Sequence, residues 1–92
     1  MAINHFTKTV TTATTEILAA NPSRIYALIQ NDSDTVQYLA FGTDAVANTG
    51  VRLAVNGSFE MGRHTNNLNG LAINGINGTG SKVVCGIELD DK

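Results

Sequence analysis

One stretch of this sequence has the composition of a loop that binds phosphate. Residues 75 to 82 contain three glycines and end in Ser81-Lys82. Glycines let backbone amides approach an anion, and a lysine can reach it. In a phosphate-binding loop, however, the lysine precedes a Ser or Thr that opens a helix, whereas here the order is reversed and a strand is expected next. We interpret the stretch as a turn.

A group of oxygen-bearing side chains could offer ligands to calcium. Asn31, Asp32 and Asp34 lie between two apolar runs. The EF-hand pattern requires a further oxygen ligand where Val36 stands, followed by a glycine and a glutamate. Short Asn and Asp side chains also bond readily to nearby main chain. We therefore interpret these residues as a hydrogen-bonded loop between strands.

The remaining candidates for catalysis are two histidines and a cysteine. His64 could pair with Glu60 or act as a base for Ser58, yet no nucleophile elbow and no orienting carboxylate supports this reading. His5 belongs to no pattern. Cys85 alternates with apolar residues, so we interpret it as a buried, inert thiol. The sequence predicts no enzyme, no metal site and no cofactor, which leaves a binding or structural role.

The length of the chain makes self-association an expected source of stability. At 92 residues the chain is one domain, and a domain of this size buries only about 60–65% of the surface that its unfolded form exposes. Small domains supplement such a core with disulfides, a metal or oligomerisation. A single cysteine excludes an intrachain disulfide, and two isolated histidines do not make a zinc site.

Charge and hydropathy argue against two classes of partner. The net charge is −2, and the six Lys and Arg residues occur singly, whereas binding to a nucleic acid backbone needs clustered basic residues. No apolar run has the length of a membrane span, and the first residues lack the segments of a signal peptide. We expect no nucleic acid and no membrane among the partners, and synthesis in a cytoplasm.

Two apolar runs around a polar cluster are the strongest structural signal. Residues 25 to 30 and 36 to 41 are rich in Ile, Tyr, Val and Phe, and the residues 31 to 35 between them favour turns. This arrangement predicts a β-hairpin. Both faces of the pair are mostly apolar, so we expect it to lie centrally in a sandwich or under a neighbouring subunit.

Further strands are predicted along the chain. Residues 51 to 55 and 59 to 61 flank Asn56-Gly57, which predicts a second hairpin with a type I′ turn. Residues 71 to 73 and 82 to 89 also read as strands, with Asn-Gly pairs forming turns between them.

The N-terminal region leaves two alternatives open. Residues 3 to 18 are rich in threonine, which favours an extended strand or arm. The spacing of Phe6, Val10, Ala13 and Ile17 also fits a helix. We favour extended structure because threonine is a poor helix former.

These elements predict an all-β protein. We expect a small antiparallel β-sandwich or jelly roll of about seven or eight short strands, with an extended N-terminal arm. Residues 1 to 18 would form the arm and first strand, and residues 19 to 92 the sandwich domain.

A series of turn and strand motifs runs through the chain: Asn21-Pro-Ser-Arg, Gln30-Asn-Asp-Ser-Asp, Tyr38-Leu-Ala-Phe-Gly, Gly50-Val-Arg-Leu and Asn56-Gly-Ser-Phe-Glu. The order of these motifs resembles a class of small virion proteins from tailed bacteriophages. Proteins of this class are small β-sandwich or jelly-roll units. They sit on capsids as decoration or cement subunits, or form modules of head fibres and other appendages, often as trimers. The resemblance extends from Asn21 to Glu60 and more loosely to Glu88.

The resemblance implies a capsid decoration (cement) protein that stabilises the head by binding the major capsid protein of the same virion. We expect a homo-oligomer, with a trimer favoured, whose residues 2 to 15 lie along a neighbouring subunit or the shell. The alternatives are a head-fibre or tail appendage module, in which residues 63 to 70 contact a glycan, and a stand-alone carbohydrate-binding or adaptor domain. The residues expected at the interface are Ile3, Phe6, Val10, Ile17, Tyr26 and Tyr38.

Overall fold

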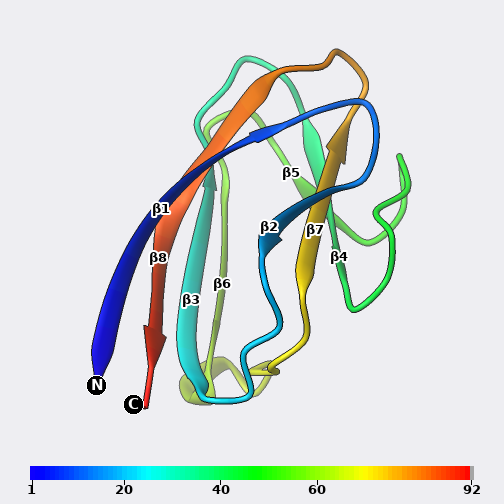
Figure 1. Ribbon diagram of the computed structural model, residues 1–92. Coiled ribbons are helices and arrows are strands. Elements are labelled where there is room, and N and C mark those ends of the chain that lie inside the picture. Colours follow the sequence, from blue (N-terminus) through cyan, green and yellow to red (C-terminus); the bar gives the residue numbers. More distant parts are fainter. Residues whose placement is uncertain (92) are drawn as a thin grey trace.

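The computed structural model describes residues 1 to 91, and over that range the chain forms eight β-strands and one short 3-10 helix (Figure 1). The predicted all-β class is confirmed. The elements in chain order are β1 (Ala2–Val10), β2 (Thr15–Leu18), β3 (Arg24–Asn31), β4 (Gln37–Phe41), β5 (Val51–Leu53), β6 (Ser58–Gly62), η1 (Arg63–Thr65), β7 (Ile73–Asn77) and β8 (Lys82–Asp90).

The strands form two antiparallel sheets that pack face to face (Figure 1). Sheet A has the strand order β1-β8-β3-β6, and sheet B has the order β2-β7-β4-β5. Within the described chain, every connection between consecutive strands changes sheet except the one from β4 to β5. Eight strands connected in this way form a jelly roll, so the predicted β-sandwich is confirmed and its topology is defined.

The core lies between the two sheets and takes alternate residues from each strand. On β3, Ala27 and Ile29 point inward and Leu28 points outward, as the pleat of a strand requires. Phe41 of β4 and Phe59 of β6 meet across the sheets, with ring centroids 5.3 Å apart. The buried apolar cluster consists of Val10, Ile17, Leu18, Ala27, Ile29, Leu39, Leu53, Met61, Ile73 and Val84.

The threonine-rich N-terminal region is extended and contributes two strands, so the helical alternative does not apply. β1 pairs with β8 along its whole length, from Ala2 opposite Asp90 to Val10 opposite Lys82. The residues expected to form an arm on a neighbouring subunit therefore form an edge strand of the chain's own sheet A. The side chain of Val10 holds this strand in place, because it is fully buried between the sheets.

The predicted central hairpin is wrong in its pairing, although both strands are present. β3 lies in sheet A between β8 and β6, whereas β4 lies in sheet B between β7 and β5. The connection is held by the buried side chain of Asn31, whose Nδ2 donates to the carbonyls of Thr35, Leu53 and Ala54. Its Oδ1 accepts from Nε2 of Gln37, the first residue of β4, at 2.8 Å. These bonds direct the chain into the opposite sheet.

The predicted second hairpin is wrong for a related reason. Residues around Asn56-Gly57 do form a turn, in which the Gly57 N–H donates to the Ala54 carbonyl at 2.8 Å. Asn56 has a φ of 60°, whereas Gly57 does not have a positive φ. A type I′ turn requires positive φ at both central residues. The observed turn joins β5 in sheet B to β6 in sheet A.

β7 occupies residues for which the sequence predicts turns. The expected strand was residues 71 to 73, followed by turns at Asn74-Gly75 and Asn77-Gly78, whereas β7 begins at Ile73 and continues to Asn77. Gly75 is buried in this strand, and a Cβ at its position would lie 2.7 Å from Cδ1 of Ile17. Glycine here leaves room for the Ile17 side chain of the neighbouring strand β2, which any larger residue would displace.

A buried ion pair joins sheet A to the loops at one end of the sandwich. Arg24 of β3 is 3% exposed, and its Nε donates to Oε2 of Glu88 on β8 at 2.7 Å. Its terminal nitrogens donate to the carbonyls of Asn69, Leu71 and Ala19 at 2.9 to 3.0 Å. One side chain thus connects two strands of sheet A with the β2–β3 loop and with the segment before β7.

Replacing Arg24 with methionine should lower the free energy of unfolding by about 3–5 kcal/mol, because it leaves the Glu88 carboxylate buried without its counter-charge. Urea unfolding followed by circular dichroism would measure the change. Arg52→Met is the matched control, because Arg52 is exposed on β5 and its replacement should change stability by no more than about 0.5 kcal/mol. Equal effects of the two substitutions would contradict the role assigned to the pair.

Candidate interaction surfaces

Several side chains that the sequence offers for ion binding or catalysis instead contact other side chains of the chain. Lys82 donates to Oδ1 of Asp34 at 2.7 Å, and this hydrogen bond, followed by the charge of the lysine, lowers the pKa of Asp34. His64 contacts Glu60. Cys85 is partly exposed, so its predicted burial is wrong. Among residues 1 to 91, no three His, Cys, Asp or Glu side chains are grouped to hold a metal ion.

The outer face of sheet A carries an apolar patch along β8. Leu28 of β3 lies opposite Ile87, and Leu89 is flanked by Tyr26 of β3 and Ile3 of β1. Ile3 is 58% exposed, and the others are partly exposed. We call this surface the outer patch, and it consists of Ile3, Tyr26, Leu28, Val83, Cys85, Ile87 and Leu89.

The outer face of sheet B is more polar. The strand alternation and register place Glu16, Asn74 and Arg52 on it, interspersed with Ala40, Ile76 and Tyr38. Tyr38, which was expected at an interface, donates its hydroxyl to Oδ1 of Asn48 at 2.9 Å. The two outer faces therefore differ, and the apolar one belongs to sheet A.

A small polar cluster borders the outer patch at Tyr26. The Tyr26 hydroxyl donates to Oε2 of Glu60 at 2.5 Å, and Nε2 of His64 lies 3.2 Å from Oε1 of the same carboxylate. The rings of Tyr26 and His64 are stacked, with centroids 6.2 Å apart. The hydrogen bond from Tyr26, and then that from His64, lowers the pKa of Glu60. The same bond to Glu60 is the main cause of the raised pKa of Tyr26.

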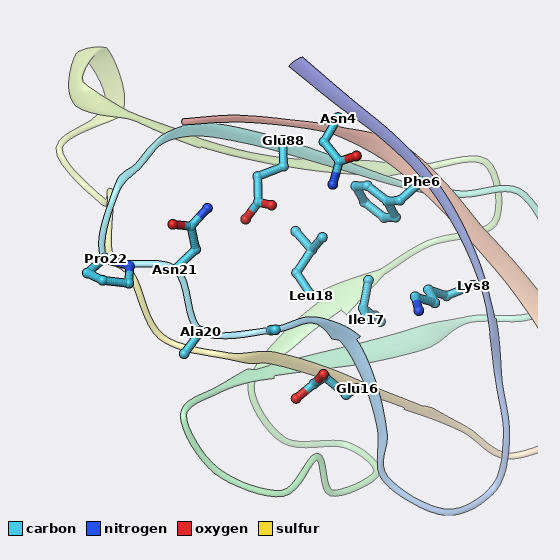
Figure 2. A pocket seen from close by; sticks show the side chains of 11 residues that line it. Asn4, Phe6, Lys8, Glu16, Ile17, Leu18, Ala20, Asn21, Pro22 and Glu88 are labelled. Atoms are coloured by element: carbon cyan, nitrogen blue, oxygen red, sulfur yellow. The ribbon is translucent and has the colours of Figure 1, made fainter. Parts of the chain in front are cut away.

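A groove of about 450 Å³ lies between β1 and β2, which are the edge strands of the two sheets on one side of the sandwich (Figure 2). Phe6 of β1 and Ile17 and Leu18 of β2 form its apolar part. Glu88 is 8% exposed, and Figure 2 shows its carboxylate pointing into the groove beside Asn4. Oε2 of Glu88 is held by Arg24, whereas Oε1 makes no hydrogen bond within residues 1 to 91.

The other residues expected at an interface occupy three different environments. Ile3 and Tyr26 belong to the outer patch. Phe6 lines the groove. Val10 and Ile17 are 0% and 1% exposed in the core, so they cannot contact a partner. Two of these five residues are therefore packed inside the chain.

Sequence reasoning missed the orientation of β8. The alternation in this strand separates Val83, Cys85, Ile87 and Leu89 from Val84 and Glu88, as predicted. The more apolar set faces outward, and the set that contains a glutamate faces the core. The local pattern does not show that Glu88 has a buried counter-charge, because its partner Arg24 lies 64 positions earlier in the chain.

Replacing Tyr26 with phenylalanine should raise the pKa of Glu60 toward its ordinary value, because the hydroxyl that stabilises the carboxylate is removed. Carboxyl carbon shifts followed by NMR during a pH titration would measure this. A lowered pKa in the folded state means that the contribution of Glu60 to stability is full above the ordinary glutamate pKa and is lost as the pH falls through the lowered value. Tyr38→Phe is the control, and an unchanged Glu60 titration in Tyr26→Phe would contradict the assignment.

Comparison of the chain with protein-family models, with curated proteins and with solved structures finds no match. In the described part of the chain, no helix is long and apolar enough to cross a membrane. The outer patch and the groove are therefore assigned from their geometry and chemistry.

Proposed function

We propose that this chain is a structural virion protein of a tailed bacteriophage, which decorates the head by binding the major capsid protein through the outer patch. The observation that carries the proposal is the difference between the two outer faces, because sheet A presents adjacent apolar residues on three strands. Exposed apolar patches on small soluble domains commonly mark protein interaction sites. The jelly roll is also a recurrent fold of viral capsid proteins, and this analogy of fold supports the proposed role.

The size of the outer patch indicates how such a protein would bind. With a strand spacing of about 4.8 Å and a rise of about 3.3 Å per residue, each outward side chain occupies about 32 Å² of the sheet, so the outer patch covers about 220 Å². A standard interface buries about 800 Å² on each partner. One patch therefore supports weak binding, and tight attachment to a shell requires several patches acting together. The proposed homo-oligomer supplies them.

The copy number on the particle distinguishes a decoration protein from a head-fibre or tail appendage module. A decoration protein covers the repeating lattice of the head and is present in hundreds of copies. A head-fibre or tail appendage module is present in a few dozen copies or fewer. Quantitative gel analysis of purified virions, with the major capsid protein as the internal standard, would separate the two.

Replacing Leu28 with lysine should weaken binding to purified heads that lack this protein by about 30-fold, which corresponds to the loss of about 2 kcal/mol at a central interface residue. Co-sedimentation with the heads over a concentration series would measure the affinity. Leu28 is partly exposed, and its neighbour Glu60 on β6 can accept the new ammonium group, so the variant should fold.

Ile76→Lys is the matched control, since Ile76 is also partly exposed but lies on the outer face of sheet B. It should bind heads as the unmodified chain does. If Leu28→Lys saturates the heads at the same concentration as the unmodified chain, or if Ile76→Lys loses binding equally, the outer patch is not the capsid-binding surface. Failure of the unmodified chain to bind heads would overturn the proposed function itself.

A further inference from the structure

The outward edge of β1 has the features of a strand that pairs with another chain. β1 runs beside β8 without a bulge, contains no proline, and is exposed over most of its length. A long, regular edge of this kind presents unpaired N–H and C=O groups that can accept a further strand. Among residues 1 to 91, the hydrogen bond from β1 to the other sheet is at its last residue, where Nδ2 of Asn77 donates to the carbonyl of Val10.

The side chains beside this edge carry complementary charges. Asn4, Phe6 and Lys8 alternate along the inner face of β1 and line the groove (Figure 2). Asn4 lies opposite Glu88 on β8, so the Oε1 atom that has no hydrogen bond lies at one end of this row. The ammonium group of Lys8 lies at the other end, and no ion pair involves it within the described chain.

We infer that two copies of this chain pair through their β1 strands, antiparallel about a two-fold axis at Phe6. The two sheets A then form one continuous eight-stranded sheet. In this arrangement the partner's Lys8 lies opposite Asn4, one strand away from Glu88, and its side chain reaches the free Oε1 across the groove. Each dimer contains this contact twice, because a two-fold interface is self-complementary.

The alternation of side chains restricts the register, and the side chains brought together favour centring on Phe6. A shift by one residue would place the inner face of one β1 beside the outer face of the other, which would break the continuity of the core. A pairing centred on His5 keeps the faces aligned but places Phe6 beside the partner's Asn4 and Glu88. Centring on Lys8 places two like charges opposite each other, which destabilises a strand pair. Centring on Phe6 pairs the two rings and brings Lys8 to Glu88.

Pairing through β1 does not depend on the proposed binding to capsids. It gives the chain a self-association surface in addition to the outer patch. The edge used for self-association is separate from most of the outer patch, so a dimer would present two patches on one side of a single sheet. Two linked patches bind a repeating surface far more tightly than one. This provides the multiplicity that a patch of about 220 Å² requires.

Sedimentation equilibrium of the purified chain, without phage heads, tests the inference. We expect a mass of two chains at high concentration, and we expect Lys8→Glu to raise the dissociation constant by about tenfold or more, since two attractive contacts become repulsive. Lys8 is exposed, so the variant should fold, and circular dichroism would check this. Arg52→Glu makes the same change of charge on sheet B and should leave the constant unchanged.

Disulfide trapping gives a second test that is specific for the register. In a Cys85→Ser background, His5→Cys chains are mixed with Thr7→Cys chains, because these positions lie directly opposite in the inferred pairing, about 5 Å apart between Cβ atoms. Oxidation should cross-link the mixture much faster than either chain alone, since identical positions are then diagonal and about 7–8 Å apart.

A monomer or a trimer at all concentrations would overturn the inference, as would a Lys8→Glu variant that associates normally or equal cross-linking in all three samples. Whether the outer patch contacts heads is measured separately, by comparing Leu28→Lys with Ile76→Lys, so failure of the inferred dimer and failure of the proposed capsid binding are distinguishable.

Discussion

The structure depends on the buried guanidinium of Arg24. It neutralises the Glu88 carboxylate, which would otherwise face the core as an uncompensated charge, and it donates to carbonyls from two loops that have no strand partners at those positions. Such pairs contribute little when compared with an apolar replacement but cost several kcal/mol when one partner is lost. Here the pair fixes where the loops cross the end of the sandwich, and it leaves one oxygen of Glu88 available in the groove.

The strands could be predicted from the sequence, but their pairing could not. β-branched and aromatic runs marked β3, β4, β5, β6 and β8, and the threonines marked β1, because these signals are local. The partners of each strand are determined by contacts between distant residues, such as the bond from Asn31 to the Leu53 carbonyl. Asn56-Gly57 correctly indicated a turn, but a turn residue does not specify whether the chain returns to the same sheet. Gly75 acts in packing, which no local pattern reveals.

The candidate surfaces were accessible to sequence reasoning only in part. Ile3 and Tyr26 were expected at an interface and lie in the outer patch, whereas Val10 and Ile17 share the same apolar character and are buried. Hydrophobicity alone does not distinguish the two faces of a strand. The decisive information was the orientation of β8, which follows from the position of Arg24 in the neighbouring strand. The groove could not be predicted, since it forms between edge strands of different sheets.

The position of β8 between β1 and β3 has a consequence for the assembly of the chain on the ribosome. In sheet A, β1 pairs with β8 alone, whereas β3 also pairs with β6, so β1 cannot take its place in the sheet until β8 has been synthesised. Pairings between distant segments also make folding slow. In the nascent polypeptide, β1 therefore lacks its strand partner, and Val10 lacks its burial between the sheets, until β8 has left the ribosome.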